Sequence, residues 1–188
     1  MAASCLEALQ QLRVESGQNA CIVGAGPVGN LCAQILRNKG VHVTVVDSHS
    51  PWLAHLFKYD VDTLSELGEL GKFDYLIETS GDDSQPQKLI EGAGPDAKLL
   101  LLGSPYEQPT HRIIAEAKNG KNILAGRPEQ QGPSWVEAIQ SIESGAICLD
   151  EHTTMVEPIE SYKKAWESVE TAVNMRVLLS FNPDLEAL

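Results

Sequence analysis

The sequence predicts an α/β fold with a doubly wound parallel sheet, and three observations support this. Short apolar or β-branched runs of strand length alternate with amphipathic helical segments along the chain. Several of these runs are almost uninterrupted, as expected for interior parallel strands covered on both faces. A glycine-rich turn joins the first run to the helical segment after it. Strands and helices in this order join through right-handed crossovers.

The first half of the chain alternates helices and strands. Leucines recur at helical spacing near the start, and the segment after the glycine turn carries an apolar face with the same period. The run after that is β-branched almost throughout, which favours an interior strand. The expected elements are a helix over residues 3–14, a strand over 20–23, a helix over 28–39, a strand over 41–47, a helix over 51–59 and a weak strand over 61–64.

The second half continues the alternation. The run 99–103 is uninterrupted and ends in glycine, which is typical of a central strand whose carboxyl end lines the ligand crevice. Trp135, Ala138, Ile139 and Ile142 recur at helical spacing and predict a core-facing stripe. The expected strands are residues 73–79, 99–103, 122–126, 153–156 and 176–181, and the expected helices are 85–93, 110–118, 134–144 and 159–173.

The glycine turn reads Gly24-x-Gly26-x-x-Gly29. In such a turn Gly24 lets the chain reverse after the strand, Gly26 has no side chain to keep a pyrophosphate from the backbone, and Gly29 lets the helix pack close to the sheet. The free N–H groups and positive dipole end of the following helix bind anions without a lysine. The turn, in this strand-to-helix context, predicts a dinucleotide-binding site.

Asp47 ends the second strand, about 20 residues after the turn, where an acid accepts hydrogen bonds from the adenosine ribose and repels a 2′-phosphate. The next residues, Ser48-His49-Ser50, offer no arginine or lysine to hold such a phosphate. The sequence therefore favours NAD(H) over NADP(H). A second interpretation is that Asp47 caps a helix that begins at Pro51.

Composition limits the possible function classes. The 188 residues suffice for one domain, so we expect a single domain over residues 1–188 with a leading helix and linker at 1–18. A net charge of -12 argues against nucleic acid or an anionic membrane as a partner. The chain has neither a long apolar span nor a secretory signal, so we expect a soluble cytoplasmic protein. The four cysteines lack metal spacing and are expected to be reduced core thiols.

Six motifs in order carry a resemblance to a known family. They lie at residues 2–9, 14–18, 24–29, 74–81, 100–103 and 175–179. Together they resemble the coenzyme-binding Rossmann domain of the medium-chain dehydrogenase/reductase family, which contains zinc-dependent alcohol, polyol and threonine dehydrogenases. The likeness runs from Ala2 to Phe181, although residues 57–62 and 94–97 depart from the usual family pattern.

The resemblance implies a role for each matching position. The 122–126 strand would be a dimer edge, because the corresponding strand of the family often pairs across a two-fold axis. Arg176 would approach the cofactor phosphates, or would instead end the preceding helix or be solvated. The implied cofactor-binding residues are Gly24, Gly26, Pro27, Val28 and Gly29 at the pyrophosphate, Asp47 at the ribose, Thr79 and Gly81 at the adenosine, and Gly103 and Ser104, with Ala125 and Gly126, at the nicotinamide.

The resemblance also implies a missing part. Members of the family begin with a GroES-like barrel that carries the catalytic zinc and the substrate pocket, and this chain is expected to start after it. None of its histidines has a cysteine or carboxylate partner at recognised metal spacing. The chain then supplies the cofactor side only and has no catalytic residue of its own. Its partner would be a covalent or separate catalytic domain.

Two classes of function stay open. The chain is the NAD(H)-binding part of a zinc-type dehydrogenase, inactive alone, or it is a stand-alone module that senses NAD(H) or assembles a complex. Binding of S-adenosylmethionine is a third option, because methyltransferases share a glycine-rich turn and an acid on the second strand. The leading helix and Arg176 argue against this option.

Overall fold

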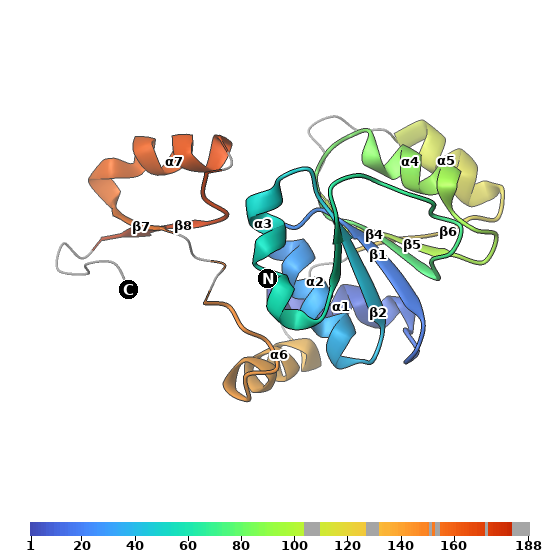
Figure 1. Ribbon diagram of the computed structural model, residues 1–188, viewed down its shortest axis with the longest axis horizontal. Coiled ribbons are helices and arrows are strands. Elements are labelled where there is room, and N and C mark those ends of the chain that lie inside the picture. Colours follow the sequence, from blue (N-terminus) through green and yellow to red (C-terminus); the bar gives the residue numbers. More distant parts are fainter. Residues whose placement is uncertain (104–109, 127–131, 151, 153–154, 172, 182–188) are drawn as a thin grey trace. The chain divides into compact units, whose positions relative to one another are not determined.

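The computed structural model describes residues 1–103, 110–126, 132–150, 152, 155–171 and 173–181 (Figure 1). The chain divides into two compact units, Met1–Ile147 and Cys148–Leu188. Each unit has its own sheet. The expectation of one domain over residues 1–188 stays a prediction.

The first unit contains a six-stranded sheet in the order β3-β2-β1-β4-β5-β6, and all five strand pairs are parallel. This order reverses direction between β1 and β4, so the predicted doubly wound α/β fold is confirmed. The strands are β1 (Asn19–Val23), β2 (His42–Val46), β3 (Asp62–Leu64), β4 (Tyr75–Glu78), β5 (Lys98–Leu101) and β6 (Asn122–Ala125).

Helices cover both faces of this sheet (Figure 1). The helices from the start and the end of the unit pack against one another, and the two helices that connect β4, β5 and β6 form a second group. Right-handed crossovers in the two opposite directions from β1 put these groups on opposite faces. The first group is α1 (Ala2–Leu12), α2 (Pro27–Asn38) and α6 (Pro133–Glu143), and the second is α4 (Gln85–Gly92) and α5 (Thr110–Lys118).

The core lies between the helices and the two central strands. All four residues of β4 are buried, and β1 is buried from Ala20 to Val23. Cys21 lies among apolar side chains that include Leu76 and Leu99, and burial raises the pKa of its thiol to about 12. Cys5, Cys21 and Cys32 are buried, as predicted for core thiols, but Cys148 is only partly buried, so the prediction is wrong for that residue. These central strands hold the carboxyl end of the sheet in place.

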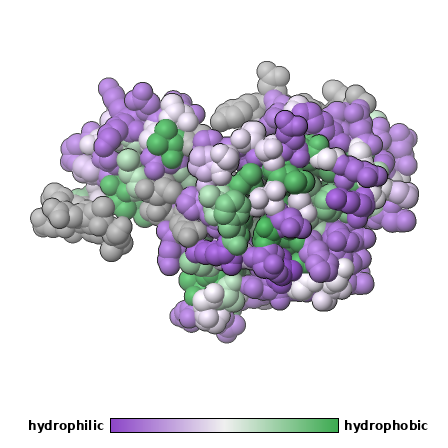
Figure 2. All heavy atoms as spheres, viewed as in Figure 1, coloured by the Kyte–Doolittle hydropathy of each residue, from purple (hydrophilic) through white to green (hydrophobic). Residues whose placement is uncertain are grey.

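Two expected features of this unit are wrong. The helix expected over 51–59 is a short α3 (Ser50–Ala54) followed by a 3-10 turn, η1 (Phe57–Tyr59), because the chain then turns at Asp60 with a left-handed φ of 55°. The predicted core stripe of α6 is largely exposed: Trp135 is 44% and Ile139 is 52% accessible, and apolar surface shows over this helix in Figure 2. Of the predicted stripe only Ala138 is buried, and α6 buries Ser134 beside it.

The second unit pairs β7 (Met155–Pro158) with β8 (Val177–Ser180) in parallel. The short turn η2 (Ile159–Ser161) and the helix α7 (Tyr162–Glu170) connect the two strands. These elements agree with the expected strand, helix and strand at the end of the chain. Residues 153–154 of the expected first strand lie outside the described residues.

Candidate functional site

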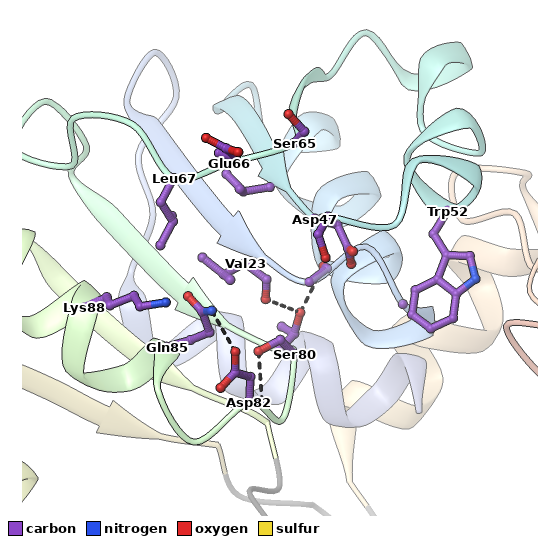
Figure 3. A pocket seen from close by; sticks show the side chains of 15 residues that line it. Val23, Asp47, Trp52, Ser65, Glu66, Leu67, Ser80, Asp82, Gln85 and Lys88 are labelled. Carbon is purple, nitrogen blue, oxygen red and sulfur yellow. Dashed lines mark hydrogen bonds between the residues drawn. The ribbon is translucent and has the colours of Figure 1, made fainter. Parts of the chain in front are cut away.

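A cavity of about 590 Å³ opens at the carboxyl ends of the central strands of the first unit (Figure 3). It lies where the strand order reverses, which is the usual ligand crevice of an open α/β sheet. Its walls come from four strand ends: Val23, Gly24 and Gly26 after β1; Val46, Asp47, Ser48 and Trp52 after β2; Ser65, Glu66 and Leu67 after β3; and Thr79, Ser80, Asp82, Gln85 and Lys88 after β4.

The three glycines of the turn differ in what they contribute to the fold. Gly24 has a φ of +106°, and a Cβ there would lie 2.7 Å from Thr79 Oγ1. A Cβ on Gly29 would overlap the carbonyl oxygen of Gly24 and lie 2.8 Å from the same hydroxyl. A side chain at either of these two positions would therefore strain the fold.

Gly26 is different, because the fold does not require a glycine there. Its φ of -62° and ψ of -176° suit any residue, and an added Cβ would meet only the Trp52 ring, at 3.6 Å. Gly26 is the N-cap of α2 and makes no side-chain cap bond, so the first N–H groups of the helix lack a side-chain partner. These groups, next to a residue without a side chain, form an anion site at the cavity wall.

Thr79 ties the turn to the neighbouring strand. Its hydroxyl lies 2.9 Å from the carbonyl oxygen of Val23 and 3.1 Å from that of Gly24, and its own N–H donates to Val23. The N–H of Gly24 donates to the Val46 carbonyl at 2.8 Å. The turn is therefore held from both sides, by β4 and by β2.

Asp47 holds the turn directly. Its Oδ2 accepts the N–H of Ala25 at 2.7 Å, and its Oδ1 accepts the N–H of His49 at 2.7 Å. The N-cap of α3 is His49, so Asp47 does not cap that helix by itself, and the capping interpretation fails in this form. Each carboxylate oxygen can accept more than one hydrogen bond, so Asp47 can still bind a ligand hydroxyl in the cavity that it lines.

A residue that the sequence analysis missed is Glu78, the last residue of β4. Its side chain is buried, and Oε1 accepts from the N–H and the hydroxyl of Ser80, each at 2.7 Å, and from the N–H of Gly81 at 3.1 Å. These bonds fix the turn that carries Ser80 into the cavity wall. A charged residue at the end of the apolar run Tyr75-Leu-Ile was the signal for it.

Three further predicted residues, Gly81, Gly103 and Gly126, are not among the residues that line the cavity. Gly81 belongs to the Glu78 turn, and Gly103 packs against the Glu78 carboxylate, where a Cβ would be 2.8 Å from the Gly81 nitrogen. Gly126 follows β6 and donates its N–H to Leu101 at 3.0 Å. Arg176 precedes β8 in the second unit, and Ser104 lies outside the described residues. The structure thus brings Gly24, Gly26, Asp47 and Thr79 together in one cavity, next to Pro27, Val28 and Gly29 at the start of α2.

Charge in the cavity wall is unbalanced. Asp47, Glu66 and Asp82 line it, and Lys88 is the cation among the described lining residues. Among the described residues there is no group of three metal-binding side chains. No helix in the described part of the chain is long and apolar enough to cross a membrane. Among the described residues at the turn, the groups that can hold a phosphate are therefore the backbone N–H groups and the dipole of α2.

Comparison with known proteins identifies similar dehydrogenases. The chain is 26% identical over 182 residues to the L-threonine 3-dehydrogenase of Idiomarina loihiensis and 28% identical over 181 residues to that of Legionella pneumophila strain Corby. Each match covers 88% of this chain and 52% of the relative. The chain therefore spans about half the length of the curated relatives that it matches.

Solved structures share the fold. An alcohol dehydrogenase from Thermotoga maritima matches with a TM-score of 0.78 and 20% identity over 94% of this chain and 54% of its own. The L-idonate 5-dehydrogenase of Escherichia coli matches with a TM-score of 0.81 and 17% identity over 96% of this chain and 55% of its own. A family model described as an FAD binding domain matches residues 18–57, from β1 into η1. This model names a flavin and not a nicotinamide cofactor.

Proposed function

We propose that this chain is the NAD(H)-binding part of an oxidoreductase similar to the zinc-type medium-chain alcohol and polyol dehydrogenases. The observation that carries the proposal is Gly26. The fold does not need a glycine at this position, which is the N-cap directly before the uncapped N–H groups of α2. A pyrophosphate that approaches the backbone does need one.

In this proposal, residues of the cavity and of neighbouring turns would bind the parts of a dinucleotide. The first N–H groups of α2, after Pro27, would hold the pyrophosphate, with Val28 and Gly29 in the first turn. Asp47 would accept the adenosine ribose hydroxyls, and Thr79 and Gly81 would border the adenosine. Gly103, Ser104 and Gly126 would line the nicotinamide half, and Arg176 would approach the phosphates. When bound, NAD+ supplies the hydride acceptor, and this chain supplies its binding and orientation.

We propose NAD(H) and not NADP(H) as the cofactor because of the negative charge of Asp47 in the cavity wall. A 2′-phosphate bound beside Asp47 would meet a carboxylate that two backbone N–H groups already hold in place. Ser48, His49 and Trp52 offer it no lysine or arginine, and Lys88 lies across the cavity on α4. Repulsion between like charges at this site would cost NADP(H) affinity.

The chemistry must be completed by another part. The described residues of this chain hold no metal-binding cluster, and the relatives are about twice as long as the matched region. A covalent or separate catalytic domain with zinc and the substrate pocket is the proposed partner. β6 is the edge strand of the described sheet, which supports a homodimer through residues 122–126. The buried cysteines are in keeping with the proposed cytoplasmic location.

Two alternatives are tested beside this proposal. The first is a stand-alone NAD(H) sensor or assembly module. The second is a flavin site, which the match of residues 18–57 to an FAD binding domain specifically favours. NAD(H) and FAD share an ADP moiety, so the turn and Asp47 could serve either.

Titration of the purified chain with NADH, NADPH, FAD and S-adenosylmethionine distinguishes these functions. We expect NADH to bind at least about tenfold more tightly than NADPH, which is about 1.4 kcal/mol. We expect no alcohol oxidation by the chain alone. Tighter binding of FAD or S-adenosylmethionine than of NADH would overturn the proposal, as would alcohol oxidation without an added protein. Alcohol oxidation that begins when a metal-binding barrel domain is added would exclude the sensor function.

A further inference from the structure

A side chain on the α4 side of the cavity contains a buried amide oxygen that has no hydrogen-bond partner among the described residues. Gln85, the first residue of α4, reaches into the cavity between Asp82 and Lys88 (Figure 3). Its Oε1 is buried, and no described residue donates a hydrogen bond to it. A buried acceptor without a donor costs free energy, so this atom is a candidate for a ligand contact.

A chain of hydrogen bonds fixes which end of the Gln85 amide faces Asp82. The Ser80 hydroxyl donates to Glu78 Oε1 at 2.7 Å. Its oxygen accepts the N–H of Asp82 at 3.1 Å. The position of Asp82 is therefore set from a buried side chain at the end of β4.

Asp82 continues the chain to Gln85. Its Oδ2 accepts the Gln85 Nε2–H at 2.9 Å and its Oδ1 accepts the Ser84 N–H at 2.8 Å. Hydrogen bonds from Gln85 and Ser84 lower the pKa of Asp82, so the carboxylate stays ionised and can only accept. The Gln85 nitrogen must face Asp82, and the oxygen must point away from it.

We infer that Gln85, together with Lys88, selects adenine over 6-oxo purines in the dinucleotide that the proposed function places here. The amino group of adenine is a donor and its neighbouring ring nitrogens are acceptors. The Gln85 oxygen would accept from that amine, and the Lys88 ammonium would donate to a ring nitrogen. Neighbouring atoms shield Oε1 from water, so the group that carries them would move aside when the base binds. Hypoxanthine would instead present a carbonyl oxygen to the amide oxygen.

The test compares NADH with reduced nicotinamide hypoxanthine dinucleotide, which differs only in the base. We expect the wild-type chain to bind NADH about 10- to 100-fold more tightly, the range for a lost hydrogen bond that leaves a polar group unpaired. Gln85→Met keeps the length of the side chain and removes the acceptor, so the ratio of the two dissociation constants should fall toward one. Gln87→Met is the matched control, because Gln87 lies on the same helix and bonds to Glu91 outside the cavity.

The outcomes separate this inference from the proposed function. If wild type binds both dinucleotides equally, the inference is overturned and the proposed function stands. If it binds neither, the proposed function itself fails. A ratio that survives Gln85→Met also overturns the inference. Asp82→Asn is a second variant for the case in which Gln85→Met does not fold: an asparagine amide can donate to Gln85, so the glutamine can turn over and the ratio should again fall.

Discussion

Gly26→Ala should abolish most cofactor binding while leaving the fold intact. The added Cβ lies 3.6 Å from the Trp52 ring, an ordinary contact, and the backbone at φ -62° and ψ -176° suits alanine. Alanine lowers the conformational entropy of the unfolded chain, which stabilises the fold by about 0.4–1 kcal/mol. It is also a poorer N-cap than glycine, which costs a similar amount. The free energy of unfolding should therefore change by less than about 1 kcal/mol.

Binding should respond much more strongly than stability. The methyl group would occupy the place where the pyrophosphate meets the N–H groups of α2, and lengthening those hydrogen bonds should weaken NADH binding about 10- to 100-fold, or about 1.4–2.8 kcal/mol. Thermal unfolding and NADH fluorescence titration of the same preparation measure the two effects. Gly68→Ala is the control, because a Cβ there meets nothing within 4 Å and Gly68 does not line the cavity.

Gly29→Ala completes the comparison. Its Cβ would overlap the Gly24 carbonyl oxygen, so the helix must move away from the turn, and overpacking of this kind costs about 1–3 kcal/mol or more. We expect a clear fall in melting temperature for Gly29→Ala and none for Gly26→Ala. A Gly26→Ala chain that binds NADH as well as wild type would refute the reasoning, because the cavity would then hold the cofactor elsewhere.

Three further predictions concern Asp47 and Thr79 at the turn and Cys21 in the core. Asp47→Asn replaces the carboxylate that accepts the N–H groups of Ala25 and His49 with an amide. Chemical denaturation should therefore show a loss of about 1–2 kcal/mol in the free energy of unfolding, and the preference for NADH over NADPH should shrink. Unchanged stability would contradict the two hydrogen bonds. Thr79→Val removes the hydroxyl that lies between the Val23 and Gly24 carbonyls, and should cost about 1 kcal/mol in the same assay, with Thr79→Ser close to wild type. Burial raises the pKa of Cys21 from 9.0 to about 12, so the folded thiol stays protonated at pH values where the unfolded thiol ionises. The free energy of unfolding should therefore be highest below pH 9 and fall as the pH rises toward 12. Alkylation of Cys21 at pH 8, followed by mass spectrometry, should require unfolding.

The sequence was most informative where the local chain alone dictates structure. The positions of the turn glycines could be predicted from their spacing, although part of the steric limit on them comes from Thr79, which follows the distant strand β4. The alternation of strands and helices also predicted the doubly wound parallel sheet, although not the order of its strands. The start of α2 and the acid at the end of β2 followed from the same pattern.

Other features depend on contacts that one sequence does not reveal. The helical period of Trp135 and Ile139 marks an apolar face, but whether that face is covered depends on packing. Of the predicted stripe only Ala138 is buried, together with Ser134 outside it. The role of Asp47 in holding Ala25 depends on how β1 and β2 align, which no local pattern encodes. Glu78 was missed because its partners, Ser80 and Gly81, become visible only once the turn has formed.

The contrast between the turn glycines has a consequence for how this chain would tolerate random mutation. In a library selected only for abundance in cells, Gly24 and Gly29 should stay fixed, while other residues should accumulate at Gly26. In a library selected for retention of the ligand, all three should stay fixed. The difference between the two selections at one codon would show whether the protein has kept its ligand, without knowledge of its substrate.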